Sequence, residues 1–162
     1  MIFTRELYLN QLIQKKQNGM VKIITGLRRC GKSFLLFNLF HNKLISQGVP
    51  ENHIIKIPLD NLDFIELRDK ISLYKFIKSK ITDNQQYYCF LDEIQLVKGF
   101  EEVLNSLLHI QNIDVYVTGS NSRFLVKDVI TEFRGRGDEI RLYPLSFKEF
   151  FENRDDDFIS AW

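Results

Sequence analysis

Cysteine, proline and long apolar runs are all scarce in this sequence of 162 residues, which contains two cysteines and three prolines. Cys30 and Cys89 match no CxxC or Cys/His metal pattern, which argues against a disulfide framework and indicates a reducing compartment. No apolar stretch approaches the roughly 18 residues of a membrane-spanning helix. The first residues also lack the apolar core of a signal peptide. We therefore expect a cytoplasmic protein with no membrane partner.

Net charge is nearly absent as well, because the formal charge is +1. A chain without an overall basic field would bind nucleic acid only through a local patch or through another part of the protein. The sequence does contain 44% apolar and 27% charged residues, which is the balance of a folded globular chain. A chain of this length can bury about 70% of its unfolded surface. We expect one domain over residues 1–162.

Short apolar runs alternate with longer mixed stretches, an order that is typical of strands and helices in a parallel α/β sheet. The run Tyr87–Leu91 is continuously apolar, as a central strand buried on both faces would be. Pro58 places the second run at the end or edge of the sheet. The expected strands are 21–25, 53–59, 87–91, 114–122 (running into a polar turn) and 138–145, and the expected helices are 32–45, 72–81, 100–110, 123–133 and 146–153.

Two of these helices carry terminal signals. Gly48 and Pro50 predict the end of the first helix. Ser146 and Glu149 have the spacing of a capping box, which predicts the start of the last helix.

The segment "GLRRCGKS" fits the pattern G-x-x-x-x-G-K-[ST] between an expected strand and an expected helix. Glycines at 26 and 31 let successive N–H groups curl around a phosphate, and the helix start adds further donors. Lys32 would reach the β- and γ-phosphates, and Ser33 would bind Mg²⁺. The pattern predicts a nucleoside triphosphate as the ligand. The expected nucleotide-binding residues are Gly26, Leu27, Arg28, Arg29, Cys30, Gly31, Lys32, Ser33 and Phe34.

Three residues inside this loop keep an alternative interpretation. Arg28 and Arg29 would either screen phosphate charge or meet a neighbouring subunit, or they are solvated surface side chains. Cys30 is either a redox-sensitive thiol near a helix start or a small residue that fills the loop.

An acidic pair, Asp92 and Glu93, directly follows the apolar strand 87–91. Asp92 is expected to hold Mg²⁺ together with Ser33, while Glu93 points to the other side of the chain and orients or deprotonates the attacking water. A glutamate beside the metal aspartate favours hydrolysis over transfer to another acceptor. No [NT]KxD stretch is present to recognise guanine, so we expect ATP rather than GTP.

The segment "VTGSNS" places three polar side chains at a strand end, Thr118, Ser120 and Asn121. They are suited to hold the water or to sense the γ-phosphate, and we take Asn121 as a catalytic candidate, with Ser120 as the alternative. Ser120 or Asn121 would equally serve as the N-cap of the helix that begins near Ser122.

Together, "GLRRCGKS", "FLDE", "VTGSNS" and "FRGRGDEIRLYPLSFKEF" resemble the AAA-type ATPases, in particular a prokaryotic group that carries an additional C-terminal domain. The resemblance implies a P-loop NTPase fold, a three-layer αβα sandwich around a five-stranded parallel sheet of order 5-1-4-3-2. It also implies that Arg136, or alternatively Arg134, completes the site of a neighbouring subunit. A turn arginine is the other interpretation of Arg136. Such ATPases continue into a helical lid, whereas this chain ends at Trp162, so the resemblance implies weak hydrolysis by this domain alone.

Two functional classes follow from these residues. In one, the domain hydrolyses Mg-ATP and acts as a switch or motor for a partner domain or subunit reached through a C-terminal extension. In the other, it is a nucleotide-dependent nucleic-acid or protein-binding module with little or no hydrolysis. The sequence contains no HExxH metal motif and no G-x-S-x-G nucleophile motif, so ester or peptide hydrolysis has no support.

Overall fold

A computed structural model of the chain describes residues 3–120, 135–147 and 149. Asn121, Arg134 and the expected helix 123–133 lie outside the described residues, as does most of the expected helix 146–153. Among the described residues, no helix is both long enough and apolar enough to cross a membrane.

Five parallel strands form one sheet in the order β2-β3-β4-β1-β5. This is the expected order 5-1-4-3-2, read from the other edge, and the fold prediction is confirmed. β2 lies at an edge and ends at Pro58, where the missing N–H of proline does least harm to the sheet. The strands are β1 (Val21–Gly26), β2 (Ile54–Pro58), β3 (Tyr87–Asp92), β4 (Ile113–Thr118) and β5 (Gly137–Leu142).

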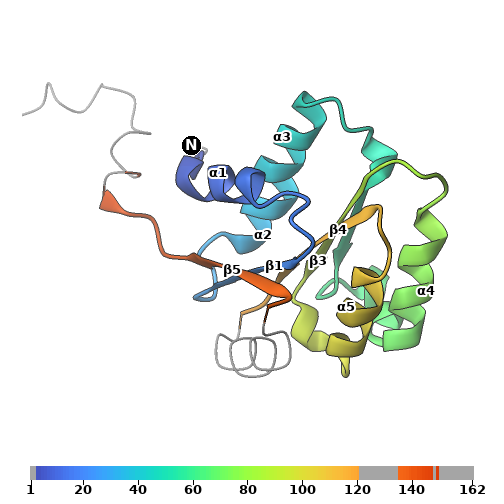
Figure 1. Cartoon of the computed structure of the whole chain (residues 1–162). Coiled ribbons are helices and arrows are strands. Elements are labelled where there is room, and N and C mark those ends of the chain that lie inside the picture. Colours follow the sequence, from blue (N-terminus) through green and yellow to red (C-terminus); the bar gives the residue numbers. More distant parts are fainter. Residues whose placement is uncertain (1–2, 121–134, 148, 150–162) are drawn as a thin grey trace, which may run out of the picture.

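Helices cover both faces of the sheet and complete three layers (Figure 1). α1 and the helix that follows β1 lie on one face, and α4 and α5 lie on the other. The bounds are α1 (Glu6–Gln14), α2 (Lys32–Phe34), a π-helical segment (Leu35–Phe40), α3 (His41–Ser46), α4 (Lys70–Lys80) and α5 (Phe100–Leu108); short 3₁₀ segments span Glu51–His53, Leu62–Arg68 and Ile94–Leu96.

The central strand β3 is buried along its whole length, as its continuous apolar run predicts. Tyr88 and Phe90 pack against the helices on the α1 side, while Tyr87, Cys89 and Leu91 pack under α4 and α5. This alternation follows from the two-residue period of a strand. Both faces of the sheet therefore carry an apolar core, which holds the strand ends in fixed positions.

The helix after β1 differs from the expected regular helix 32–45. It runs without a break from Lys32 to Ser46, but its middle portion has π-helical hydrogen bonding. Its end is as predicted, since Gly48 has a φ of 89° and the N–H groups of Gly48 and Val49 donate to the carbonyls of Ile45 and Leu44. The capping box is also confirmed, because Ser146 N donates to Glu149 Oε2 at 2.8 Å and Glu149 N donates to Ser146 Oγ at 3.2 Å.

Two elements do not follow from the sequence reasoning. α1 buries only Tyr8 and Leu12, a pair one helical turn apart, which is too short a pattern to predict a helix. The 3₁₀ segment Leu62–Arg68 has no buried residue, so it leaves no periodic signal at all.

A buried ion pair joins β1 and β4 at the amino ends of these strands. Lys22 Nζ donates to Asp114 Oδ1, and both side chains are almost wholly inaccessible to solvent. Asp114 Oδ2 accepts a second bond from Tyr116 Oη at 2.7 Å and a third from Gln17 N at 2.9 Å. Burial lowers the pKa of Lys22, and the neighbouring carboxylate opposes that shift. The pair is satisfied only while both partners are present.

We expect Lys22→Met to lower the free energy of unfolding by about 3–5 kcal/mol, because it leaves the Asp114 carboxylate buried without its cation. Lys56→Met is the matched control, since Lys56 is also a strand lysine but pairs with the exposed Glu51 at 3.7 Å; its loss should stay below about 1 kcal/mol. Urea unfolding of both variants measures the difference. Equal losses in the two variants would contradict the structural role assigned to the buried pair.

Candidate functional site

The two glycines of the phosphate loop are required for different reasons. Gly26 ends β1 with a φ of 147°, and a Cβ at this position would overlap the backbone carbonyl oxygen of Leu142 in the neighbouring β5. Gly31 has a φ of 93° but open space around it, so only its backbone conformation demands glycine. The start of the loop is thus packed closely against β5, whereas the end of the loop has open space beside it.

Lys32 begins the helix after the loop, and its side chain is buried within the loop. The Nζ atom donates to the carbonyl oxygens of Leu27 at 2.8 Å and Gly26 at 3.1 Å. The ammonium group at the end of the loop is therefore bonded to two carbonyl groups at the start of the same loop.

Ser33 and Asp92 meet although they belong to different elements. Ser33 Oγ lies 2.7 Å from Asp92 Oδ2 and 3.0 Å from Oδ1, and Thr118 Oγ1 at the end of β4 donates to Asp92 Oδ1. Burial raises the pKa of Asp92, and the hydrogen bonds from Thr118 and Ser33 oppose this shift. Thr118 is fully buried, and its hydroxyl group is directed at Asp92 rather than at solvent.

Glu93 follows Asp92 directly, and its carboxylate has other partners. Its backbone is left-handed, with φ 57° and ψ 49°, and its N–H donates to Thr118 Oγ1 at 3.1 Å. The carboxylate oxygen Oε2 accepts from Ser120 Oγ at 2.9 Å, from Ser120 N at 3.3 Å and from Gln95 Nε2. Adjacent carboxylates thus face different partners: Asp92 faces the phosphate loop and Glu93 faces the end of β4.

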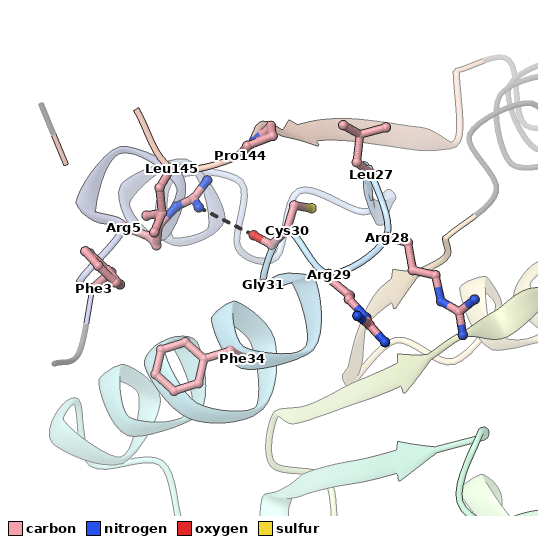
Figure 2. Close-up of a pocket in the computed structure, with 10 residues that line it drawn as sticks. All are labelled: Phe3, Arg5, Leu27, Arg28, Arg29, Cys30, Gly31, Phe34, Pro144 and Leu145. Atoms are coloured by element: carbon pink, nitrogen blue, oxygen red, sulfur yellow. Dashed lines mark hydrogen bonds between the residues drawn. The ribbon is translucent and has the colours of Figure 1, made fainter. Parts of the chain in front are cut away.

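A pocket of about 500 Å³ lies beside the phosphate loop (Figure 2). Much of its wall is apolar and comes from three separate parts of the chain: the segment before α1, the loop itself and the segment after β5. Its lining residues are Phe3, Arg5, Leu27, Arg28, Arg29, Cys30, Gly31, Phe34, Pro144 and Leu145.

The remaining loop residues that the sequence singled out differ in exposure. Arg28 and Arg29 are exposed at the edge of the pocket, and Figure 2 shows both guanidinium groups on the side away from Phe3. Cys30 is buried, with Sγ 3.9 Å from the carbonyl oxygen of Leu142, so it fills the space between the loop and β5.

Arg136 is not brought to these residues. It immediately precedes β5, its carbonyl accepts from Val21 N at the start of β1, and its Nη1 donates to Asn105 Oδ1 on α5 at 3.1 Å. The phosphate loop follows the carboxyl end of β1. Arg136 therefore lies at the amino ends of the strands, opposite the site in its own chain.

Five further side chains at the site do not follow from the sequence reasoning: Phe3, Arg5, Gln95, Pro144 and Leu145. Phe3, Arg5 and Gln95 belong to no recognisable motif, while Pro144 and Leu145 lie in a segment that carries the family resemblance. Gln95 lies two residues after Glu93, but only the folded chain brings its amide to the Glu93 carboxylate.

A family model described as an AAA domain matches residues 18–151. The chain belongs to the AAA domain family. Two curated relatives are also similar: an uncharacterized protein of Haemophilus influenzae, 36% identical over 96% of this chain and 39% of its own length, and an uncharacterized protein of Methanocaldococcus jannaschii, 32% identical over 82% of this chain and 28% of its own length. This AAA domain therefore spans less than half of the length of either relative.

Solved structures share the fold of this AAA domain at low sequence identity. AMPPCP-bound DnaA from Aquifex aeolicus aligns with a TM-score of 0.59 and 17% identity, over 92% of this chain and 48% of DnaA. A chain of the Drosophila ORC bound to DNA aligns with a TM-score of 0.58 and 11% identity, over 89% of this chain and 93% of that one. The three-layer αβα fold of an AAA-type P-loop ATPase domain is thus confirmed.

We expect Gly26→Ala to destabilise the domain more than Gly31→Ala. The first substitution forces a methyl group against the β5 backbone, whereas the second adds only the left-handed backbone cost of about 1–2 kcal/mol. Urea unfolding of the two variants measures the difference. A Gly26→Ala variant as stable as Gly31→Ala would show that β5 moves away from the loop without cost.

We expect Asp92→Asn to raise the unfolding temperature of the ligand-free domain by a few degrees at neutral pH. Because the pKa of Asp92 is raised in the folded state, the proton is held more tightly there than in the unfolded chain. Stability from this group is therefore greatest at low pH and is lost as pH rises through the raised pKa. The amide of Asp92→Asn does not ionise, so this variant does not lose stability in that way. The difference in unfolding temperature between the variant and the wild type should therefore shrink as pH falls toward about 4.

Thermal unfolding in EDTA at several pH values tests this expectation. Asp63→Asn, an exposed carboxylate in the 3₁₀ segment after β2, serves as the control and should leave the unfolding temperature unchanged. An Asp92→Asn advantage that stays constant with pH would contradict the role of ionisation.

Proposed function

We propose that this domain binds Mg-ATP and hydrolyses it to ADP and phosphate. The single observation that carries the proposal is the contact between Ser33 Oγ and the Asp92 carboxylate at 2.7 Å, directly after the loop that holds Lys32. An oxygen group from α2, another from the end of β3 and one ammonium group are thereby gathered at the carboxyl ends of the strands. Such an arrangement supports a triphosphate with its cation.

The donor set fits Mg²⁺. This ion prefers oxygen ligands and is usually held by one or two protein groups together with substrate phosphates. Ser33 and Asp92 would hold it here, and within the described residues no group of three or more His, Cys, Asp or Glu side chains forms a separate metal site. When bound, Mg²⁺ neutralises charge that develops on the phosphates.

Glu93 is the proposed group that orients or deprotonates the attacking water. In this structure its Oε2 atom already accepts hydrogen bonds from Ser120 and Gln95, so this oxygen is occupied by protein donors. Hydrolysis by this route therefore requires Glu93 to leave Ser120 and turn toward the water. Asn121, outside the described residues, stays a candidate for sensing the γ-phosphate.

The pocket beside the loop is the proposed site of the adenine base. Its apolar side chains, among them Leu27, Phe34 and Leu145, offer surfaces on which a flat ring packs. DnaA, which shares the fold, was solved with AMPPCP, an adenine nucleotide analogue, and this supports ATP as the ligand. Arg28 and Arg29 at the pocket edge would screen phosphate charge.

The position of Arg136 and the length of the relatives bear on the partners of the domain. Arg136 lies opposite its own site, so it would act on the site of a neighbouring subunit rather than on its own. Both curated relatives have additional length beyond the part that this chain matches, which supports a switch or motor that acts on a further domain. The alternative is a nucleotide-dependent binding module. The ORC match, a complex with DNA, favours nucleic acid as its partner.

We expect Glu93→Gln to lower ATP turnover by about 10²- to 10⁴-fold, the usual contribution of a general base. The affinity for Mg-ATP should be retained, because Lys32, Ser33 and Asp92 are unchanged. A malachite-green assay of phosphate release measures turnover, and calorimetry measures binding.

Two further variants complete this experiment. Glu66→Gln changes an exposed carboxylate away from the site and should keep full turnover, whereas Lys32→Ala should lose binding. No phosphate release by the wild-type protein, with Mg-ATP binding intact, would favour the binding module. An absence of Mg-ATP binding would refute both functions.

A further inference from the structure

Arg5 is a buried charged residue that lies outside every motif in the sequence. Its side chain is 6% exposed, and its backbone is left-handed, with φ 46° and ψ 41°, at the N-cap of α1. Such a conformation is uncommon for a residue with a long side chain and persists only where surrounding contacts hold it.

The guanidinium group of Arg5 joins three separate segments beside the pocket. Nη1 donates to the carbonyl oxygen of Cys30 in the phosphate loop at 3.4 Å, a contact drawn in Figure 2. Nη2 donates to the carbonyl oxygen of Tyr143 after β5, and Nε lies 3.1 Å from Glu149 Oε1. The Tyr8 ring lies beneath the group, 4.8 Å from its central carbon. A planar fork of donors is suited to three acceptors in fixed positions.

The contact with Cys30 has a geometric consequence for the loop. In a trans peptide the C=O and N–H groups point in opposite directions, and no cis peptide occurs among the described residues. When the Cys30 carbonyl is held toward Arg5, the Gly31 N–H in the same peptide is turned away from Arg5. Gly31 lies immediately before Lys32, whose ammonium group is held inside the loop.

We propose that Arg5 is a positioning residue that presets the Cys30–Gly31 peptide so that the Gly31 N–H donates to a phosphate oxygen. This inference rests on the proposed nucleotide site and adds to it a residue from the N-terminal segment. Arg5 itself touches no phosphate. Its effect is to remove the need for the loop to reorganise when the anion binds.

Binding of inorganic pyrophosphate, ATP and adenosine to full-length variants tests the inference. We expect Arg5→Lys and Arg5→Met to bind pyrophosphate and ATP about tenfold more weakly, the effect of one misdirected hydrogen bond to a charged group. Adenosine carries no phosphate, so any loss of its affinity, through the place of Arg5 in the pocket wall, should be smaller than the loss for pyrophosphate. Thermal unfolding identifies any variant that fails to fold.

Two further variants separate this role from a general loss of packing. Tyr8→Phe removes the hydroxyl that accepts from Tyr143 N at 3.3 Å, which loosens the same junction without touching the loop. It should bind pyrophosphate as the wild type does. Glu149→Gln weakens the anchor of Arg5 at a partly exposed position, and it should weaken pyrophosphate binding by a smaller factor.

Unchanged pyrophosphate affinity in both Arg5→Lys and Glu149→Gln would overturn the inference. An equal loss for adenosine would also overturn it, because Arg5 would then act through the pocket wall rather than through the loop. Wild-type protein that binds neither ATP nor pyrophosphate would refute the proposed function itself, and the inference with it.

Discussion

The parallel direction of all five strands is the constraint on which the rest of this structure depends. In a parallel sheet the carboxyl ends of all strands lie on the same side. The loop after β1, the acidic end of β3 and the polar end of β4 therefore meet there. The hydrogen bond between Ser33 and Asp92 and the bond between Thr118 and Asp92 both follow from this meeting. An apolar core on each face of the sheet keeps the strand ends in register.

The two ends of the sheet differ in how their charges are satisfied. At the amino end, Lys22 and Asp114 form a buried pair whose remaining oxygen is bonded by Tyr116. At the carboxyl end, Asp92 accepts from the hydroxyl groups of Ser33 and Thr118, and burial raises its pKa. The first arrangement stabilises the fold. The second is a buried carboxylate with a raised pKa, which is typical of functional sites.

Backbone strain gathers at the same edge. Four non-glycine residues in the described part of the chain have positive φ, and three of them surround the site: Arg5, Arg29 and Glu93. Each holds a charged side chain beside the loop, the pocket or the end of β4. Strain of this kind is retained where the surrounding contacts fix it. Arg5 also links the loop to Tyr143 and Glu149, so the first helix and the segment leaving β5 share one anchor.

Local patterns in the sequence determined the loop, the strand–helix alternation, the helix end at Gly48 and the capping box of Ser146, because each depends on neighbouring residues and on fixed backbone preferences. The sheet order came from the resemblance of several motifs taken in order. Only the tertiary structure decided that Gly26 lies against Leu142 and that Gln95 reaches Glu93. It likewise decided that Arg5 holds Cys30. These contacts join residues through packing and chain direction across the fold, and no periodicity or spacing along a single chain records them.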